Sequence, residues 1–337
     1  MTAMLNCTQN DKTMSAMQNS TQNDNFVTVL IIRIKREVTM QKPSNTRIIM
    51  NKNKVLRKMF ESDNIIVAPG AFSPLGAMIA QQVGFKCVYM SGYGVSAYKL
   101  GYPDVGLMTM TETLDTARAM VRSVDIPLIS DVDTGYGDVI NMKRTVEEFE
   151  GAGISAIQME DQVWPKRCGH MEGKQLIPAE QMVQKIRIAV DSRKDPDFLI
   201  IARTDANTVF GFEEAIRRCN LYREAGADVI FFESPTSREQ LQQIPKLINA
   251  PLMINMSEGA KTPIYDNSTL EKMGYKLVIW PSSATWAAAR AIKEIYQIIM
   301  DKGTTANDLE KMILFHDFNE LIGLPKVMEL SNKYKSQ

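Results

Sequence analysis

The chain has 337 residues, and its 39 Lys and Arg residues balance 39 Asp and Glu residues, so the formal net charge is zero. This balance argues against a general nucleic-acid binder, which would carry a basic excess. No apolar run reaches the roughly 18 residues that a membrane helix needs, and the four cysteines are too scattered for a disulfide framework or a zinc site. We therefore expect a cytoplasmic protein that binds neither nucleic acid nor membrane.

Residues 1–49 differ in composition from the rest of the chain. They are rich in Asn, Gln, Thr, Ser and Met, and Thr-Gln-Asn-Asp occurs twice. Such a segment buries too little apolar surface to order itself. We predict a disordered N-terminal extension, with Met40 and Met50 as alternative starts. A targeting segment is the other interpretation, although Asp11 and Asp24 are unusual in a transit peptide.

From about residue 64, short β-rich runs alternate with longer amphipathic runs. The pattern predicts strands at 65–68, 87–90, 127–131, 156–159, 198–202, 229–232, 252–255 and 276–280. The clearest intervening helices are 139–150, 179–192, 212–225 and 284–300, and several helices end at glycine. This alternation predicts a (β/α)8 barrel within 50–337, with a helical extension at 301–337. A doubly wound open sheet is the alternative, but its GxGxxG signature does not follow the first strand.

Polar side chains follow nearly every predicted strand, at the rim where barrel enzymes carry their active sites. Asp131 and Asp133 are two apart at one strand end, so their side chains point to the same face. With Glu160 after the next strand, they predict a site for Mg²⁺, which prefers oxygen ligands. The alternative is that these acids cap helices or pair with Arg203.

The segment Lys166-Arg167-Cys168-Gly169-His170 gathers a thiol, an imidazole and two cations. Nearby cations stabilise a thiolate, so we expect Cys168 to be an acid-base group or a nucleophile. The alternative is a small buried hydrophobic residue, which is the usual role of a lone cysteine. The segment 91–94 (SGYG) offers backbone N–H groups and a hydroxyl for a carboxylate.

Together these motifs resemble the isocitrate lyase and phosphoenolpyruvate mutase superfamily, in its methylisocitrate lyase and 2,3-dimethylmalate lyase branch. The resemblance covers roughly residues 55–335. The motifs that carry it are SGYG (91–94), GYPDVG (101–106), DVDTGYG (131–137), MEDQ (159–162), PKRCGH (165–170), ARTDA (202–206) and NMSEGAKTP (255–263).

The resemblance implies a (β/α)8 barrel whose last helix is swapped between the subunits of a homotetramer. It implies Mg²⁺, with Mn²⁺ as the alternative, held by Asp131, Asp133 and Glu160, with Asp104 behind them. Cys168 would be the acid that protonates a carbanion, with His170 and Lys166 beside it, and Tyr89, as tyrosinate, the base. The implied substrate-binding residues are Ser91, Gly92, Tyr93, Arg167, Gly169, Arg203, Glu233 and Asn255.

The implied activity is retro-aldol cleavage of a 2-hydroxy dicarboxylate to pyruvate and a carboxylic acid. Trp286 stands where methylisocitrate lyases carry an arginine for an additional carboxylate, which favours a smaller substrate such as 2,3-dimethylmalate. Lys261 could replace that arginine, so methylisocitrate cleavage to pyruvate and succinate remains an alternative. Oxaloacetate hydrolysis to oxalate and acetate is another, and a non-catalytic barrel is a third.

Overall fold

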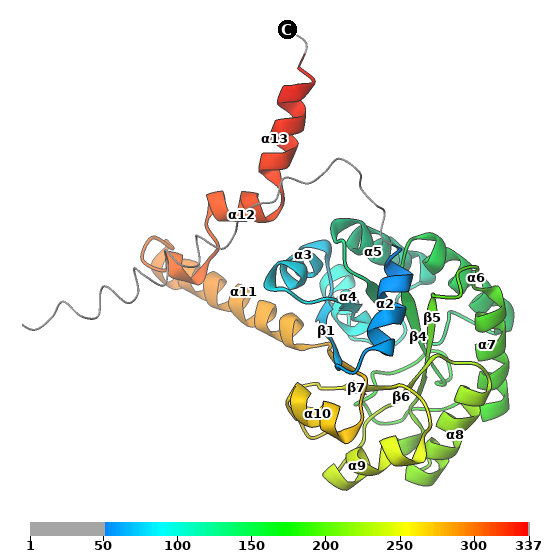
Figure 1. The fold of residues 1–337 in the computed structure, drawn as a ribbon. Coiled ribbons are helices and arrows are strands. Elements are labelled where there is room, and N and C mark those ends of the chain that lie inside the picture. The colour runs from blue at the N-terminus through cyan, green and yellow to red at the C-terminus, as the bar shows by residue number, and fades with distance from the viewer. Residues whose placement is uncertain (1–50, 336–337) are drawn as a thin grey trace, which may run out of the picture. The chain divides into compact units, whose positions relative to one another are not determined.

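The computed structural model describes residues 51–335, so the prediction for residues 1–49 lies outside it. Eight parallel strands form a closed barrel in which each strand pairs with the next along the chain and β8 pairs with β1 (Figure 1). This confirms the predicted barrel and excludes the open sheet. The strands are β1 (Ile66–Ala71), β2 (Val88–Met90), β3 (Leu128–Asp131), β4 (Ala156–Glu160), β5 (Leu199–Thr204), β6 (Val229–Phe232), β7 (Leu252–Asn255) and β8 (Leu277–Trp280).

Helices surround the barrel, and most of the apolar core lies between them and the strands. The helices of the barrel are α2 (Lys52–Glu61), α3 (Pro74–Val83), α4 (Gly92–Val95), α5 (Met110–Ser123), α6 (Val139–Gly151), α7 (Ala179–Ser192), α8 (Phe212–Glu224), α9 (Arg238–Leu247) and α10 (Asn267–Met273). A π-helical turn at Ser96–Leu100 continues α4, and a 3₁₀ turn at Ala206–Thr208 follows β5.

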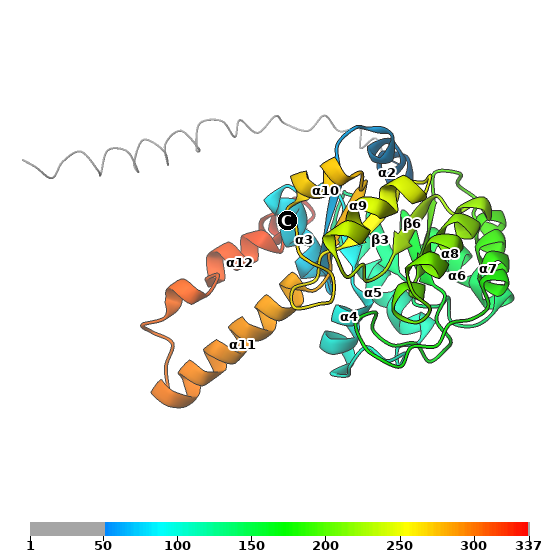
Figure 2. The ribbon, with the colours of Figure 1, turned by 90° about the horizontal axis from the view of Figure 1, so that it is seen from below.

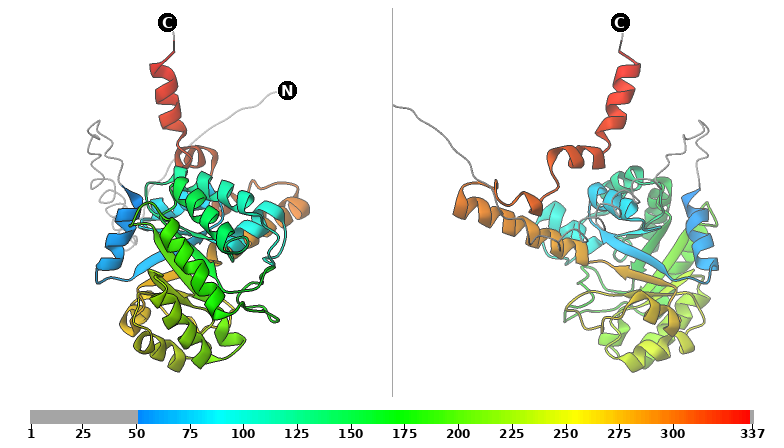
Figure 3. Two further views of the ribbon diagram at one scale, coloured as in Figure 1. Left: turned by 90° about the vertical axis from the view of Figure 1, so that its right-hand side faces the viewer. Right: turned by 60° about the vertical axis from the view of Figure 1, so that its left-hand side comes forward.

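A second, smaller core fills the inside of the barrel. Alternate residues of the strands point inward, such as Ile66 and Ala68 of β1, while their neighbours face the helices. Helix α2 covers one end of this core, where Leu56 is fully buried (Figure 3). The barrel is therefore closed at that end, which leaves the carboxyl ends of the strands for a binding site.

The helix predicted at 284–300 is α11 (Ser283–Lys302). The predicted helical extension follows it and contains, within the described residues, a 3₁₀ turn (Leu309–Lys311), α12 (Phe315–Leu321) and α13 (Leu324–Lys333). Figures 1 and 2 show these helices leading away from the barrel. Large apolar side chains on them are exposed, including Tyr296, Met300, Phe315 and Val327. Within residues 51–335, no helix is both long and apolar enough to cross a membrane.

Candidate active site

A cavity of about 270 Å³ opens at the carboxyl ends of the strands. Most of the residues singled out in the sequence line it. These are Tyr89, Ser91, Tyr93, Asp104, Asp131, Lys166, Cys168, Gly169, His170, Arg203, Glu233 and Asn255. The structure therefore brings together side chains from seven different segments of the chain, as the barrel rule predicts.

Three of the predicted carboxylates lie buried at the ends of neighbouring strands. Asp131 ends β3, Asp133 follows it, and Glu160 ends β4. The backbone N–H of Asp133 donates to Oδ1 of Asp131 at 3.0 Å. Gly92 lies against this pair, because a Cβ atom there would be 2.7 Å from Oδ2 of Asp131. Gly92 thus allows the carboxylate to approach the backbone rather than lining the cavity itself.

The loop after β3 contains residues with positive φ angles, and a lysine of α7 stabilises it. Asp133 and Tyr136 have positive φ angles of 50° and 60°, which non-glycine residues adopt at a cost. The buried ammonium of Lys185 on α7 donates to the carbonyls of Thr134 and Gly137, the second at 2.9 Å. Burial lowers the pKa of Lys185 to about 8. This lysine, which the sequence analysis missed, fixes the loop that carries Asp133.

Burial dominates the electrostatics of the carboxylates. It raises the pKa of Asp131, raises that of Asp133 to about 7, and raises that of Glu160 well above its usual range. Lys166 opposes the shift at the two aspartates, and Arg203 opposes it at Glu160. A carboxylate with such a pKa is short of cationic partners, which a divalent cation would supply.

The acids around the cavity also outnumber the buried cations. The acids are Asp104, Asp131, Asp133, Glu160, Asp205 and Glu233, and the cations are Lys166, Lys174, Lys185 and Arg203. Among the described residues, the buried oxygens Glu160 Oε1 and Glu233 Oε2 have no hydrogen-bond partner, although the second lies 3.6 Å from Nη1 of Arg203. Buried carboxylate oxygens without hydrogen bonds are costly unless a metal ion or substrate binds them. The donor set therefore fits a hard, oxygen-binding cation.

Within the described part of the chain, three ligand atoms meet within 4.8 Å only on α12, at His316, Asp317 and Glu320. All three are exposed, a common arrangement without a metal ion. The barrel carboxylates therefore stand further apart. An ion among carboxylates at this spacing would be held partly through water.

Lys166 pairs with two carboxylates rather than with the thiol of Cys168, which follows two residues later in the sequence. Its ammonium lies 2.5 Å from Oδ1 of Asp104 and 2.8 Å from Oδ1 of Asp133. Burial lowers its pKa, but these acids outweigh burial and raise the pKa well above the ordinary value. Lys166 thus links Asp104 to Asp133, and a place for Asp104 behind the metal ligands stays a prediction.

Arg167 does not line the cavity. Its side chain is exposed, and its guanidinium donates to the carbonyl of Glu172 at 2.9 Å. Gln162 holds the adjacent backbone in both directions, donating to the carbonyl of Arg167 and accepting from its N–H, each at 2.9 Å. The structure therefore gives Arg167 a role in the shape of the loop, and its contact with substrate stays a prediction.

Cys168 is mostly buried at the cavity wall, so its expected chemistry changes. Burial raises the pKa of the thiol, although a hydrogen bond from the backbone of His170 lowers it. The backbone N–H of Cys168 donates to the carbonyl of Asp104 at 3.1 Å. The thiol is therefore protonated at neutral pH. That state suits a proton donor and disfavours the thiolate nucleophile that the neighbouring cations suggested.

Tyr89 is also buried. Its hydroxyl donates to Oε1 of Gln158 at 2.7 Å. Burial and then the charge of Asp131 raise its pKa well above the ordinary value. These surroundings favour the neutral phenol over tyrosinate. Gln158 was missed in the sequence, although it lies two residues before Glu160 on β4 and so faces the same side.

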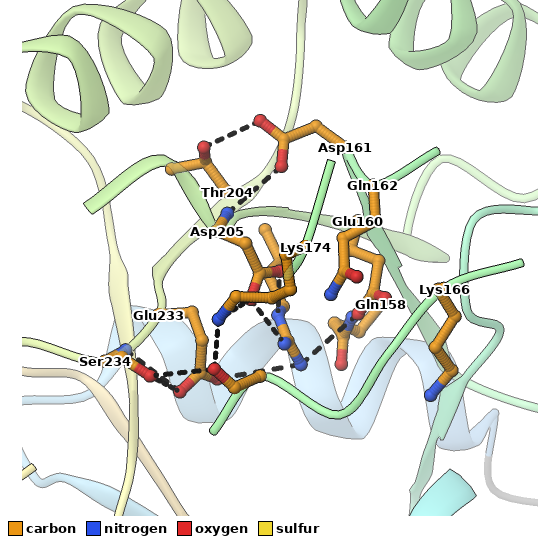
Figure 4. Close-up of polar contacts among 12 residues, drawn as sticks. Gln158, Glu160, Asp161, Gln162, Lys166, Lys174, Thr204, Asp205, Glu233 and Ser234 are labelled. Atoms are coloured by element: carbon orange, nitrogen blue, oxygen red, sulfur yellow. Dashed lines mark hydrogen bonds and ion pairs between the residues drawn. The ribbon is translucent and has the colours of Figure 1, made fainter. Parts of the chain in front are cut away.

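Arg203 is held by three carboxylates. Its Nε and Nη2 donate to the two oxygens of Asp205 at 2.9 and 3.0 Å, and Nη1 lies 3.3 Å from Glu160 and 3.6 Å from Glu233. Figure 4 labels these three acids. These acids raise the pKa of Arg203, although burial alone lowers it. The guanidinium is therefore a fixed positive charge at the cavity wall, able to bind the oxygens of an anionic substrate.

His170 joins the loop to β6 and β7. Its Nδ1 is 3.4 Å from the hydroxyl of Ser234 and its Nε2 is 3.3 Å from Nδ2 of Asn255. Ser91 caps α4, where its hydroxyl accepts from the N–H of Gly94, while its own N–H donates to Ala71. Its hydroxyl proton, rather than its backbone N–H, is therefore the group that it offers to a ligand.

The far wall of the cavity is aromatic. Trp286 lines the cavity and packs edge-to-face on Tyr93, with ring centroids 6.5 Å apart. Lys261 is not part of the lining, since its ammonium binds the carboxylate of Glu172. The lysine that was considered as a substitute for an arginine is therefore engaged elsewhere.

Comparison with known proteins gives a consistent result. The model of the phosphoenolpyruvate phosphomutase family matches residues 56–300. The 2,3-dimethylmalate lyase of Eubacterium barkeri is 44% identical over 285 residues, which cover 85% of this chain and 99% of that protein. The 2-methylisocitrate lyase of Aeropyrum pernix is 45% identical over 269 residues, which cover 80% of this chain and 86% of that protein.

Solved structures agree. Oxaloacetate acetylhydrolase with 3,3-difluorooxalacetate has a TM-score of 0.81 at 33% identity, covering 85% of this chain and 98% of that one. Phosphonopyruvate hydrolase with oxalate and Mg²⁺ has a TM-score of 0.78 at 31% identity, covering 85% of this chain and 99% of that one.

Proposed function

Because the chain belongs to the phosphoenolpyruvate mutase and isocitrate lyase superfamily, we propose that it is a metal-dependent carbon–carbon lyase. The substrate is a 2-hydroxy dicarboxylate like 2,3-dimethylmalate, which would give pyruvate and propionate. One observation carries the proposal. A protonated thiol, Cys168, lines the same cavity as Asp131 and the fixed guanidinium of Arg203.

Asp131, Asp133 and Glu160 would hold Mg²⁺, with Mn²⁺ as the alternative. When bound, the ion would polarise the substrate oxygens and lower the cost of the alkoxide. Arg203 and the hydroxyl of Ser91 bind the carboxylate and hydroxyl oxygens of the substrate, which fixes its orientation. Trp286 and Tyr93 pack against its carbon skeleton.

Two proton transfers complete the reaction. The substrate hydroxyl must lose its proton, and the neutral phenol of Tyr89 is a poor acceptor. Glu233 lines the cavity with an oxygen that lacks a hydrogen-bond partner among the described residues, so we assign this step to it. After the carbon–carbon bond breaks, Cys168 donates its proton to the carbanion carbon of the propionate fragment.

The cavity wall favours the smaller substrate. A tricarboxylate such as 2-methylisocitrate needs a cation for its additional carboxylate, but Trp286 occupies the wall and Lys261 binds Glu172. A lost charge-assisted contact costs roughly 1.5–3 kcal/mol of binding. Oxaloacetate hydrolysis is the second candidate, because oxaloacetate acetylhydrolase has the same fold at 33% identity.

The exposed apolar side chains of α11 to α13 support a further part of the proposal, that these helices pack on a second copy within a homotetramer. Light scattering after gel filtration tests the tetramer. A cytoplasmic location belongs to the same proposal, since the described cysteines Cys87, Cys168 and Cys219 are free thiols.

A substrate panel tests the activity. The protein is supplied with Mg²⁺ and 2,3-dimethylmalate, 2-methylisocitrate or oxaloacetate, and pyruvate and oxalate are measured. We expect pyruvate from 2,3-dimethylmalate at the highest kcat/KM. Cys168→Ser should lower kcat by about 10²–10⁴-fold while still binding substrate. Pyruvate from neither of the first two substrates would refute the lyase, and oxalate as the sole product would favour the hydrolase. Inactivity toward all three would favour the non-catalytic barrel.

A further inference from the structure

Lys174 is a buried lysine with no role in the chemistry described above. It lies in the loop that joins β4 to α7 and also carries Cys168, yet only 8% of the residue is exposed. Its ammonium donates to the carbonyl of Gly169 and lies 3.2 Å from Oδ1 of Asp205. A lysine is almost never buried to this extent without a specific partner. Lys174 therefore ties the loop to the end of β5.

Asp205, which lies beside Lys174 in Figure 4, also holds Arg203. Both oxygens of Asp205 accept from that guanidinium, and Lys174 shares one of them. Burial alone would raise the pKa of Asp205, but Arg203 and Lys174 outweigh it and lower the pKa. One carboxylate thus joins the loop lysine to the arginine that faces the substrate.

The backbone of Gly169 contacts two side chains that line the cavity, those of Arg203 and Glu233. A Cβ atom at Gly169 would lie 2.4 Å from Nη2 of Arg203 and 2.9 Å from Cγ of Glu233, so the backbone is in direct contact with both side chains. Its carbonyl accepts from Lys174 and, at 3.4 Å, from the hydroxyl of Ser234. Because Cys168 directly precedes Gly169, these contacts fix where the thiol stands.

We propose that Lys174 is the positioning residue for the Cys168 thiol, acting through the Gly169 carbonyl and neutralising Asp205 when the loop is docked. This role rests on the proposed lyase function. The catalytic value of an acid depends on its placement to within a fraction of an ångström, so loss of the anchor should reduce proton donation. Binding of the substrate oxygens depends on Arg203 and the carboxylates and should change much less.

The chain supplies a matched control. Lys261 binds Glu172 in the same loop, but the side chains of this pair are 34% and 84% exposed. Exposed ion pairs contribute little, whereas the removal of one partner of a buried pair has a large effect. Lys174→Met and Lys261→Met therefore remove the same charge from two anchors of one loop, one buried and one exposed.

Two measurements test the proposal. The first is kcat and KM on 2,3-dimethylmalate. The second is the alkylation rate of Cys168 by iodoacetamide, followed by peptide mass spectrometry, which separates it from the fully buried Cys87 and Cys219. For Lys174→Met we expect kcat to fall at least tenfold, KM to change by less than about threefold, and alkylation to accelerate at least tenfold, as positioning predicts. Lys261→Met should stay within about twofold of the parent chain.

The proposal would be overturned if Lys174→Met had the same kcat and the same alkylation rate of Cys168 as the parent chain. A lower kcat with an unchanged alkylation rate would also overturn it. If Lys174→Met fails to fold, Lys174→Gln replaces it, because its amide still donates to Gly169 but cannot neutralise Asp205. For Lys174→Gln we then expect an alkylation rate of Cys168 between the rates of the parent chain and of the unfolded protein. A rate equal to that of the parent chain would refute the role. Alkylation needs no turnover, so it tests Lys174 even if the substrate panel shows the proposed function to be wrong.

Discussion

The buried carboxylates of the cavity predict that folding stability depends on Mg²⁺ and that this dependence changes with pH. The perturbation is a pH series with and without Mg²⁺, applied to the wild-type chain and to Asp133→Asn. Asp133 is the informative group because burial raises its pKa from 3.8 to about 7, despite the nearby ammonium of Lys166.

Asp133 binds its proton more tightly in the folded state than in the unfolded state, and this difference sets the direction in which stability changes with pH. The folded state keeps the proton of Asp133 up to about pH 7, whereas the unfolded state releases it near pH 4. Without metal, the free energy of unfolding therefore falls as the pH rises from about 4 to 7 and is constant above that. The shift of roughly three pKa units corresponds to about 4 kcal/mol for this group alone.

A bound metal ion should restore the free energy of unfolding that is lost as the pH rises, because the ion binds the ionised form of Asp133. Protonation of Asp133 competes with the ion below pH 7, so Mg²⁺ should bind about tenfold more weakly at about pH 6 than at about pH 8, or about 1.4 kcal/mol. An ion at 100 times its Kd stabilises by about 2.7 kcal/mol, which raises Tm by about 5–10 °C. At about pH 6 the same ion concentration should raise Tm by about 3–6 °C less.

Differential scanning fluorimetry measures these shifts, with EDTA samples as the metal-free reference. Asp133→Asn has no proton to lose, so its metal-free Tm should exceed that of the wild type above about pH 7 and should respond weakly to Mg²⁺. An equal Mg²⁺ shift at both pH values, or a full shift in Asp133→Asn, would show that the reasoning about this carboxylate is incorrect.

Two further substitutions separate stability from specificity. Asp161→Ala removes a buried carboxylate that accepts from Arg218 at 3.0 Å and Tyr222 at 2.7 Å. We expect a loss of about 3–5 kcal/mol in urea unfolding, because Arg218 loses its fully buried partner and keeps the more exposed Glu214. An unchanged midpoint would contradict this. Trp286→Arg places a cation at the cavity wall, so kcat/KM for 2-methylisocitrate should rise about tenfold or more relative to 2,3-dimethylmalate. A competition assay with both substrates measures the ratio, and an unaltered ratio would remove Trp286 as the specificity residue.

The barrel was predictable because the strands repeat one simple pattern. Runs such as 229–232 and 252–255 are apolar on both faces, since one face meets the barrel interior and the other meets the helices. The same geometry explains why acids at the strand ends were found together. The carboxyl ends of parallel strands meet at one rim, so Asp131 and Glu160 had to be close whatever the details of packing.

The roles of adjacent acids were less well predicted. Glu160 and Asp161 are adjacent in the sequence, but their side chains point in opposite directions. Glu160 pairs with Arg203, whereas Asp161 binds Arg218 of α8. The alternation of side chains along the strand carries this information, because Ile157 and Met159 belong to the outer core and Ala156 to the inner one.

Side-chain directions in the loop after β4 follow no such rule, so the sequence left open whether Cys168 is an acid-base group or a nucleophile. Neighbours in sequence predicted cations beside the thiol, but Lys166 turns to Asp104 and Asp133 while Arg167 turns outward to Glu172. With those charges committed elsewhere, burial decides the pKa of the thiol and keeps it protonated. The proton-donor role that we propose for Cys168 requires that protonated state. The cation that matters for the placement of Cys168 is then Lys174, six residues further along the chain, because it reaches the loop backbone and Asp205 at once.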